Sequence, residues 1–429
     1  MARNSKENST KKAALDYHEF PQPGKLEIRA TKPLANQRDL SRAYSPGVAE
    51  ACLEIKEDEN TASKYTSKGN LVAVISNGTA VLGLGNIGPG ASKPVMEGKA
   101  VLFKKFANID CFDIEVDEDN PQRLAEIVAS LEPTFGAINL EDIKAPDCFE
   151  VERLCKEKMK IPVFHDDQHG TAIVVGAAAV NAIELSNRKI ENTKIVAVGA
   201  GASGIACLEM LVKLGAKREN IWLSDSKGLI TKNRSEINEE KKRFSQDSTL
   251  SNLDDVIKDC DMFLGLSGPG VLTSKMVLKM NKQPIIFALA NPDPEINPAD
   301  ALKVAPDALI ATGRSDYPNQ VNNVLCFPFI FRGALDVGAT QINDEMKLAC
   351  IHAIANLARQ TSTAETVEAY QGEILKFGKE YLIPKPFDPR LLPNVAVAVA
   401  EAAMKSGVAS RPLKDLEAYK QKLEGSVYK

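Results

Sequence analysis

The chain has no marked excess of charge of either sign and no long apolar run. Its 53 Lys and Arg residues nearly balance 57 Asp and Glu residues, giving a formal net charge of −4. Proteins that bind nucleic acids or anionic membranes usually carry a basic excess, so we expect neither partner. No apolar run reaches the length of a membrane span, and the opening residues are mostly polar, unlike a secretion signal. These absences favour a cytoplasmic location.

The sequence also lacks closely paired cysteines. Zinc and redox sites usually need two cysteines a few residues apart, whereas the eight cysteines of this chain are scattered. We therefore expect reduced thiols at Cys52, Cys111, Cys148, Cys155, Cys207, Cys260, Cys326 and Cys350. A length of 429 residues is enough for at least two domains with sizeable cores.

A glycine-rich turn is the most informative segment of the chain. It follows an apolar run over residues 195–198 and precedes a predicted helix, as in dinucleotide-binding folds. Gly199 permits the tight turn, Gly201 lets the backbone approach a pyrophosphate, and Gly204 allows the helix to pack on the strand. Ser203 lies in the same turn. A methyltransferase loop or a plain strand-to-helix turn remains an alternative for this segment alone.

An acidic residue follows the turn at the distance that a dinucleotide site requires. Residues 221–225 form a second predicted strand that ends in Asp225, where a ribose 2′-hydroxyl needs an acceptor. Asp225 favours NAD, whereas the next residues, Ser226 and Lys227, could bind the 2′-phosphate of NADP. Both cofactors stay open on these residues.

Alternation of strand-like and helical patterns predicts an α/β fold. We predict an N-terminal α/β domain over residues 1–160 and a Rossmann-like, doubly wound domain with C-terminal helices over residues 161–429. The predicted strands, besides a hairpin, cover residues 111–116, 137–140, 161–164, 195–198, 221–225, 262–266, 284–289 and 308–312. The predicted helices cover residues 100–106, 121–131, 149–158, 170–185, 344–358 and 395–404, and the helix over 170–185 links the two domains.

Two further local features are expected near the start of the chain. The first dozen residues are polar and predict a disordered or loosely attached segment. Apolar runs at residues 71–75 and 80–84 flank Asn77-Gly78, a dipeptide typical of the turn of a β-hairpin.

Two acidic pairs follow predicted strands directly. Glu141 and Asp142 come after the strand over 137–140, and Asp166 and Asp167 come after the strand over 161–164. Open α/β sheets bind ligands at the carboxyl ends of their strands, so both pairs could share one cleft. Carboxylate oxygens suit a hard cation such as Mg²⁺ or Mn²⁺. Solvated turn carboxylates are the alternative for either pair alone.

His165 and His169 flank the second acidic pair at a spacing of four, which could suit a helical zinc site. The segment follows a strand rather than lying in a long helix. We therefore favour neutral imidazoles that are hydrogen-bonded in a strand-to-helix turn.

Lys99 and Tyr44 are candidates for proton transfer. Lys99 heads a predicted helix, where the helix dipole would lower the ammonium pKa, as burial would, and a general base needs that lowering. Tyr44 precedes a Ser-Pro-Gly turn that would hold its backbone. The alternatives are an exposed surface lysine and a packed aromatic ring.

With these segments in order, the chain resembles the malic enzyme family, particularly its bacterial members. The similar segments are Ala43-Tyr44-Ser45-Pro46-Gly47, Glu97-Gly98-Lys99-Ala100, Asn139-Leu140-Glu141-Asp142 and Phe164-His165-Asp166-Asp167-Gln168-His169-Gly170. The resemblance implies that Lys99 is the general base, oriented by Asp166, and that Tyr44 is the general acid. It also implies that the divalent metal is held by Glu141, Asp142 and Asp167.

The resemblance further implies oxidative decarboxylation of malate to pyruvate and CO₂ with reduction of NADP or NAD. The Asp-Ser-Lys-Gly segment at Asp225 is similar to that of NADP-using members, and a homodimer is the expected assembly. Amides at Asn291, Asn322 and Asn323 are implied to touch the substrate, Asn291 also lying at the cofactor. One departure is that Thr79 and Ala80 stand where larger eukaryotic members place a carboxylate-binding arginine. A methyltransferase, a non-catalytic regulatory module and a malate dehydrogenase without decarboxylation are the alternatives.

Overall fold

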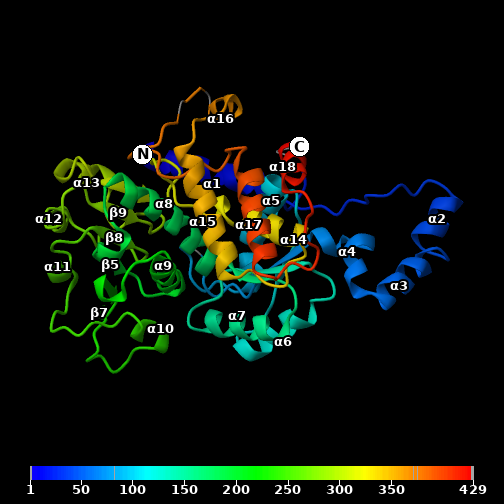
Figure 1. Ribbon diagram of the computed structural model, residues 1–429, viewed down its shortest axis with the longest axis horizontal. Coiled ribbons are helices and arrows are strands. Elements are labelled where there is room, and N and C mark those ends of the chain that lie inside the picture. Colours follow the sequence, from blue (N-terminus) through cyan, green and yellow to red (C-terminus); the bar gives the residue numbers. More distant parts are fainter. Residues whose placement is uncertain (1, 82, 371, 374, 427–429) are drawn as a thin grey trace.

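Two sheets of largely parallel strands form the centre of the molecule (Figure 1). The computed structural model describes residues 2–81, 83–370, 372–373 and 375–426. The first sheet has the strand order β2-β1-β3-β4, and all its strands are parallel. Its strands are β1 (Leu71–Ser76), β2 (Asp110–Glu115), β3 (Ala137–Leu140) and β4 (Val163–His165).

Helices cover both faces of the first sheet. Every residue of β1 is buried, and its side chains alternate between two apolar clusters. One cluster contains Val72 and Val74 with α5 (Pro89–Ala107). The other contains Ala73 and Ile75 with α6 (Pro121–Ser130) and α7 (Asp147–Lys158). A strand buried on both faces is typical of a parallel α/β sheet.

The predicted β-hairpin is wrong. β1 pairs with β2 on one side and β3 on the other, so no edge of β1 is free for residues 80–84. Val81 instead forms an isolated antiparallel bridge with Gly85, and Leu82 lies outside the described residues. Gly78 has a φ of +67°, so the chain does turn here, but it turns toward α5 and not back along β1.

The second sheet has the order β10-β9-β8-β5-β6-β7, and only β7 is antiparallel to its neighbour. Its strands are β5 (Ile195–Val198), β6 (Ile221–Asp225), β7 (Gly228–Leu229), β8 (Met262–Gly265), β9 (Ile285–Ala288) and β10 (Leu309–Thr312). The accompanying helices are α9 (Ala202–Lys213), α10 (Glu239–Lys242), α11 (Leu253–Val256), α12 (Ser274–Val277) and α13 (Pro298–Val304). The predicted strands of this part are confirmed to within a few residues.

A buried helix, α8 (Thr171–Leu185), connects the two sheets and packs on α9 and α15. The C-terminal helices are α14 (Phe327–Asp336), α15 (Asp344–Arg359), α16 (Ala364–Ala369), α17 (Leu391–Lys405) and α18 (Leu416–Glu424). They also cover the first sheet, because Phe103 of α5 contacts Phe327 and Phe331 of α14 with ring centroids 4.7 and 5.2 Å away. The predicted domain boundary after residue 160 falls before β4, which belongs to the first sheet.

The beginning of the chain is helical from Ala2 onward, so the predicted disorder is wrong, whereas loose attachment stays a prediction. Its elements are α1 (Ala2–Glu19), α2 (Gln37–Ala43), α3 (Val48–Glu57), η1 (Glu59–Thr61), α4 (Ala62–Tyr65) and η2 (Ser67–Asn70). Figure 1 shows α2 and α3 projecting away from both sheets. The remaining short turns are η3 (Asp166–Gly170), η4 (Ile190–Asn192), η5 (Arg218–Asn220) and η6 (Asn323–Leu325).

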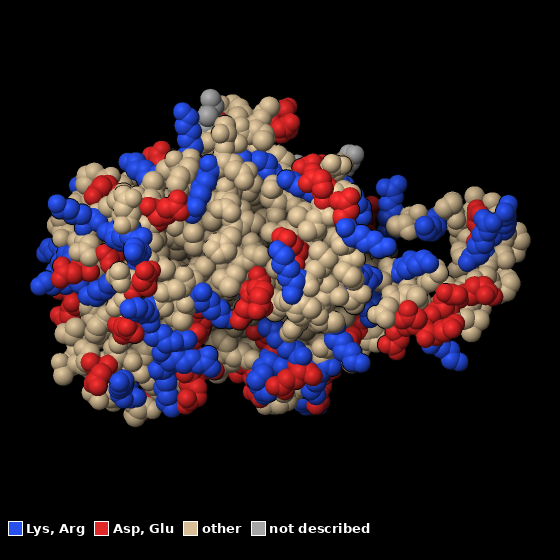
Figure 2. All heavy atoms as spheres, in the orientation of Figure 1, with Lys and Arg blue, Asp and Glu red and all other residues tan. Residues whose placement is uncertain are grey.

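The visible surface mixes charges of both signs. Figure 2 shows Lys and Arg side chains interspersed with Asp and Glu over the body and over the projecting helices. Among the residues with described coordinates, no helix combines the length and apolar character needed to cross a membrane.

Candidate active site

The two acidic pairs meet at the rim of the first sheet. Glu141 and Asp142 follow β3, and Asp166 and Asp167 open the π-helical turn η3 that follows β4. The backbone N–H of Asp142 donates to Oδ2 of Asp167 at 2.8 Å. Asp142 has a φ of +53°, a left-handed conformation that is uncommon outside glycine and is often found at functional sites.

Three of these carboxylates form a group suited to a divalent cation. Glu141, Asp142 and Asp167 each offer one oxygen, and these oxygens lie within 4.8 Å of one another. Burial and nearby acids raise the pKa of Glu141 to about 8 and the pKa values of Asp142 and Asp167 to about 7. Because three crowded carboxylates repel one another, a bound cation would stabilise their charged forms. An oxygen-only group of this kind fits Mg²⁺ or Mn²⁺.

Lys99 lies against this acidic group. Its Nζ is 2.7 Å from Oδ2 of Asp166 and 2.8 Å from Oε1 of Glu141, and its side chain is 12% exposed. The ammonium group also lies 4.5 Å from the ring centroid of Phe327. The structure therefore brings together Lys99 and both acidic pairs, and the alternative of an exposed surface lysine is wrong.

The expected cause of a low Lys99 pKa is also wrong. Helix α5 begins at Pro89, ten residues earlier, so Lys99 lies in the middle of the helix and far from its N-terminal dipole. Burial lowers the pKa of Lys99, but the carboxylates of Asp166 and Glu141 outweigh burial and raise it overall.

Asp166 is held in place from several sides. It is fully buried, and its Oδ2 accepts from Lys99 and, at 3.0 Å, from Nδ2 of Asn323. Oδ1 of Asn323 in turn accepts from the hydroxyl of Thr171 at 3.1 Å. Asn323 thus contacts the Lys99–Asp166 pair, whereas the neighbouring Asn322 caps η6 by accepting from the backbone N–H of Val324. Sequence reasoning did not identify Thr171 as part of this network.

The glycine turn has the geometry of a dinucleotide-binding loop. Gly199 has a φ of +107°, and a Cβ there would lie 2.2 Å from the carbonyl oxygen of Leu266. A Cβ at Gly204 would lie 1.9 Å from the carbonyl oxygen of Gly199, so α9 packs closely on the turn. A Cβ at Gly201 would meet nothing within 4 Å, which leaves room for a phosphate group above the backbone.

Ser203 joins the glycine turn to the acidic group. Its hydroxyl donates to the backbone carbonyl of Asp167 at 2.7 Å. Since Asp167 is one of the three grouped carboxylates, the turn that would bind a cofactor lies directly beside the candidate metal site. Sequence reasoning placed Ser203 in the turn but did not predict this link.

Asp225, at the end of β6, is paired with two cations. Arg234 binds it through both carboxylate oxygens at 2.9 and 3.1 Å, and Nζ of Lys241 lies 2.9 Å from Oδ2. Burial raises the pKa of Asp225, but these hydrogen bonds outweigh burial and lower it to about 2. Ser226 and Lys227 are exposed next to it, and Nζ of Lys227 pairs with Glu236 at 2.8 Å. Arg234 lies in an irregular stretch and Lys241 lies in the short helix α10, and no sequence signal marked either residue.

The loops after β8 and β9 are held by a buried acid that the sequence analysis missed. Glu295 accepts from the backbone N–H of Ser267 at 2.8 Å and from that of Ala290 at 3.0 Å. Asn291 follows Ala290 and is exposed, close to the position that a side chain at Gly313 would occupy. Asn291 therefore lies at the carboxyl ends of the strands of the second sheet, as a cofactor contact requires.

His165 and His169 do not join the acidic group. His169 bonds to Glu152 at 2.7 Å, with Nζ of Lys347 3.3 Å from its other nitrogen. Burial lowers the pKa of His169 to about 3 and that of His165 to about 4. The hydrogen-bonded neutral imidazole is confirmed for His169, but neither ring nitrogen of His165 has a hydrogen-bond partner among the described residues, and its Nδ1 lies 3.8 Å from Oδ2 of Asp167. In that same part of the chain, the one group of three candidate ligands contains no histidine.

Comparison with known proteins agrees with this geometry. Residues 23–126 match the family model for the malic enzyme N-terminal domain, and residues 168–370 match that for the malic enzyme NAD-binding domain. A solved malic enzyme from Pyrococcus horikoshii Ot3 is 41% identical, covers 97% of this chain and 96% of its own, and superposes with a TM-score of 0.88. The chain belongs to the malic enzyme family. Its predicted fold class is thereby confirmed, and the methyltransferase alternative is wrong.

Malic enzymes similar to this chain are named for either cofactor. The NADP-dependent malic enzyme of Haemophilus influenzae is 60% identical over 421 residues, which are 98% of this chain and 56% of that protein. The NAD-dependent malic enzyme of Rhizobium meliloti is 60% identical over 417 residues, which are 97% of this chain and 54% of that protein. The chain thus spans about half the length of these curated relatives.

Tyr44, the remaining residue implied by the malic enzyme motifs, is not at the acidic group within one chain. It lies between the projecting helices α2 and α3, and 74% of its surface is exposed. Neither helix has a buried residue. The chain therefore brings Lys99, the acids and the glycine turn together but leaves Tyr44 apart.

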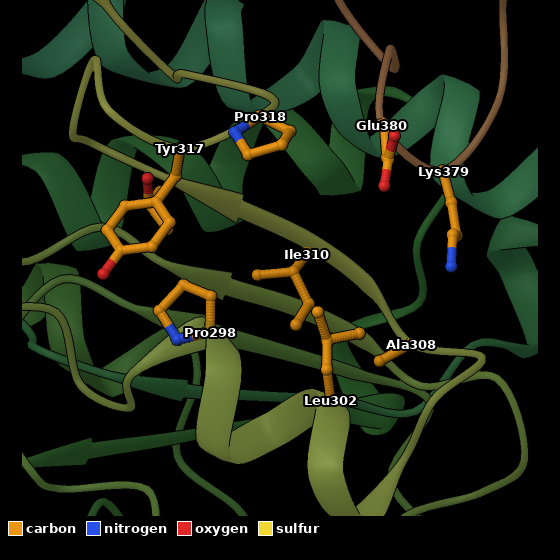
Figure 3. Close-up of a pocket in the computed structure, with 9 residues that line it drawn as sticks. Pro298, Leu302, Ala308, Ile310, Tyr317, Pro318, Lys379 and Glu380 are labelled. Carbon is orange, nitrogen blue, oxygen red and sulfur yellow. The ribbon is translucent and has the colours of Figure 1, made fainter.

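Two cavities in the described part of this malic enzyme chain lie elsewhere. One of about 70 Å³ lies at the edge of the second sheet, where Pro298, Leu302 and Ile310 lie between Tyr317 on one side and Lys379 and Glu380 on the other (Figure 3). A larger one, of about 260 Å³, lies between η1, α14 and the loop that contains Arg411. Neither cavity is lined by a residue of the acidic group. The candidate active site is therefore identified by the chemistry of its residues and not by the depth of a cavity.

Proposed function

We propose that the protein catalyses the oxidative decarboxylation of (S)-malate to pyruvate and CO₂, with reduction of NADP and with Mg²⁺ or Mn²⁺. The observation that carries this proposal is the buried contact of Lys99 with Asp166 and Glu141, directly beside the grouped carboxylates. Ser203 brings the glycine turn to the same place. Membership of the malic enzyme family supports the same reaction.

Glu141, Asp142 and Asp167 would hold the metal, and the glycine turn with Asn291 would hold the dinucleotide. When bound, the metal supplies Lewis acidity at the substrate oxygens and the nicotinamide supplies a hydride acceptor. The buried Asp166 orients Lys99 through its 2.7 Å contact, and Asn323 orients Asp166. Asn322, the N-cap residue directly before η6, is the amide that we assign to the substrate.

Lys99 is the group placed to accept the proton of the malate hydroxyl. Its raised pKa belongs to a chain in which four carboxylates crowd one ammonium group. Charge on Glu141 that is shared with a cation would act less on Lys99, and burial would then lower the Lys99 pKa toward the range of a general base. After CO₂ leaves, a second proton transfer must protonate the remaining enol carbon. We assign the hydroxyl of Tyr44 as the proton donor of this step.

NADP is favoured because the end of β6 carries more positive than negative charge. Arg234 and Lys241 already neutralise Asp225, so the carboxylate no longer repels a 2′-phosphate. Their side chains remain 18% and 24% exposed and could donate further hydrogen bonds to a phosphate group. Ser226 and Lys227 stand exposed beside them.

A rate assay tests the proposal. Malate is supplied with each of NADP and NAD and each of Mg²⁺ and Mn²⁺, while reduced nicotinamide and pyruvate are measured separately. We expect pyruvate to form in equal amount to reduced cofactor, with a higher kcat/KM for NADP. Reduced cofactor without pyruvate would show a dehydrogenase that does not decarboxylate, and no turnover would support a non-catalytic module. A higher kcat/KM for NAD would contradict the role of Arg234 and Lys241.

A further inference from the structure

The loops after β8 and β9 lie beside the glycine turn. Figure 1 shows β5, β8 and β9 side by side, and the strand order places β8 between the other two. The backbone N–H of Leu266 donates to the carbonyl of Val198 at 2.8 Å, directly before Gly199. The N–H of Leu289 donates in the same way to the carbonyl of Gly265 at 3.0 Å. Both loops therefore leave the sheet at the rim where the glycine turn would hold a dinucleotide.

One carboxylate joins these two loops. Glu295 is completely buried in the loop after β9, and its two oxygens bind different main-chain groups. Oε1 accepts from the N–H of Ser267 at 2.8 Å, and Oε2 accepts from the N–H of Ala290 at 3.0 Å. The carbonyl of Glu295 also accepts from the N–H of Leu272 at 3.1 Å. Glu295 thus holds the loop after β8 near both of its ends and the loop after β9 near its start.

The end of β8 leaves room for this carboxylate. A Cβ at Gly265 would lie 2.4 Å from Cδ of Glu295, so a larger residue there would displace the carboxyl group. A buried carboxylate is costly unless its oxygens accept hydrogen bonds, and here each oxygen faces one N–H group. A glutamine has one acceptor oxygen, so its own NH₂ group would face the second N–H. The position therefore requires a carboxylate and not only a side chain of this size.

The joined loops carry a residue that is expected to contact the cofactor. Asn291 directly follows Ala290, and Nη1 of Arg314 donates to the next carbonyl, that of Pro292, at 3.0 Å. The strand order places β8 and β9 on one side of β5 and β6, which ends in Asp225, on the other. Because the acid at the end of β6 marks the adenosine ribose, the loops after β8 and β9 would face the nicotinamide half. NADP and NAD share that half.

We propose that Glu295 is a positioning residue for the nicotinamide half of the cofactor. Its carboxylate fixes the loop after β9, and with it Asn291, relative to the loop after β8. That second loop packs on the glycine turn, because the carbonyl oxygen of Leu266 would lie 2.2 Å from a Cβ at Gly199. The inference rests on the proposed binding of NADP. It adds that cofactor affinity depends on a buried acid whose oxygens bind only the two loops.

Cofactor binding by Glu295→Gln tests the inference. Fluorescence titration gives the dissociation constants of NADP and NAD without turnover, and titration calorimetry gives the affinity for Mn²⁺. We expect both cofactor dissociation constants to rise by the same factor, about tenfold, because a charged hydrogen bond is lost in a region that both cofactors share. The affinity for Mn²⁺ should not change. Asp300→Asn on α13 is the control, because its side chain is 51% exposed and pairs with Lys303.

The other outcomes separate the positioning role from different roles of Glu295. Unchanged affinity of Glu295→Gln for both cofactors, with normal binding by the wild-type protein, would overturn the inference and leave the proposed function intact. A loss of affinity for NADP alone would place Glu295 at the 2′-phosphate and would also overturn it. An equal loss of Mn²⁺ affinity would show general damage to the fold and contradict a positioning role. A wild-type protein that bound neither cofactor would refute the proposed function itself.

Hydrogen–deuterium exchange gives a second test that does not depend on a stable variant. Ser267 is exposed, so its amide should exchange quickly unless Glu295 holds it. We expect the amides of Ser267 and Ala290 to exchange slowly in the wild-type protein, and the amide of Ser267 to exchange much faster in Glu295→Gln. Mass spectrometry of peptides that contain these residues measures both rates. Rapid exchange of the Ser267 amide in the wild-type protein would overturn the inference.

Discussion

Two charged clusters of the molecule have opposite balances of positive and negative charge. At the rim of the first sheet, the single ammonium group of Lys99 faces four carboxylates, those of Glu141, Asp142, Asp166 and Asp167. At the end of β6, the single carboxylate of Asp225 faces the two cations of Arg234 and Lys241. The first cluster is short of positive charge and the second is short of negative charge.

This difference explains why the pKa shifts have opposite signs. Burial and nearby acids raise the pKa of Asp142 to about 7, whereas hydrogen bonds from Arg234 and Lys241 overcome burial and lower the pKa of Asp225 to about 2. Aspartate carboxylates in these two surroundings thus predict different ligands. The first cluster suits a metal cation, and the second suits a phosphate anion. The Ser203–Asp167 hydrogen bond keeps the glycine turn in contact with the first cluster.

The largest expected effect is the loss of turnover when the only cation of the first cluster is removed. We expect Lys99→Ala to lower kcat by about 10²- to 10⁴-fold, the range for general acid–base catalysis. Binding of NADP, measured by fluorescence titration, should change little, since Lys99 does not contact the glycine turn. Lys104→Ala is the matched control on the same helix, because its side chain is 55% exposed. Normal turnover of Lys99→Ala would remove Lys99 from the mechanism.

A smaller effect is expected when one carboxylate of the first cluster is neutralised. Asp142→Asn should weaken Mn²⁺ binding by about 100-fold or more, since even residues that only support a metal ligand contribute 10- to 100-fold. Isothermal titration with Mn²⁺ measures this directly. Asp147→Asn, outside the metal group, serves as the control. Unchanged Mn²⁺ affinity in Asp142→Asn would place the metal elsewhere.

The same cluster predicts a pH dependence of stability without metal. The folded-state pKa values of about 8 for Glu141 and about 7 for Asp142 and Asp167 lie above the usual unfolded values. The folded state then binds protons more strongly, so these groups lower the stability as the pH rises from about 4 to about 8. The melting temperature of the metal-free protein should fall over this range, and saturating Mn²⁺ should remove most of the fall. A fall of equal size with Mn²⁺ would contradict the assignment.

The second cluster should respond to the opposite change, the removal of a cation. We expect Lys241→Ala to raise the KM for NADP by about tenfold and to leave the KM for NAD nearly unchanged, because a hydrogen bond to a charged group contributes about 1.5–3 kcal/mol. Lys242→Ala is the neighbouring control, whose side chain is 51% exposed and pairs with Glu239. Equal changes for both cofactors would argue against a 2′-phosphate contact.

The smallest expected effect concerns the link between the glycine turn and the first cluster. Ser203→Ala removes one neutral hydrogen bond, with a value of about 1 kcal/mol, so a change of about fivefold in kcat/KM is expected. Metal affinity and NADP affinity should both fall slightly, because Asp167 and the glycine turn lose a shared contact. Ser245→Ala, which removes a hydroxyl that bonds to Lys242 within a surface turn, is the control. An effect on one ligand alone would mean that the two regions are independent.

Local patterns were enough for much of the fold. The predicted strands of the second sheet agree with β5, β6, β8, β9 and β10, because short apolar runs bounded by turn residues identify buried parallel strands. The acidic pairs were placed correctly at strand ends, where a parallel sheet collects them at one edge. The start of α5 was missed, because Pro89 and Gly90 look like a turn although proline is well tolerated in the first turn of a helix. The hairpin was wrong because its turn signal is local, whereas the partners of β1 are distant in sequence.

The sequence by itself determined the family, the α/β class, the doubly wound second sheet, the glycine turn and the residue types of the site, since each of these depends on short motifs and local spacing. Only the tertiary structure decided which charges meet. It placed Lys99 between Asp166 and Glu141, and it brought Arg234 from an irregular stretch and Lys241 from α10 to Asp225. It also separated Tyr44 from Lys99 within one chain. Contacts between residues far apart in sequence depend on how helices and strands pack, and no local sequence pattern indicates that packing.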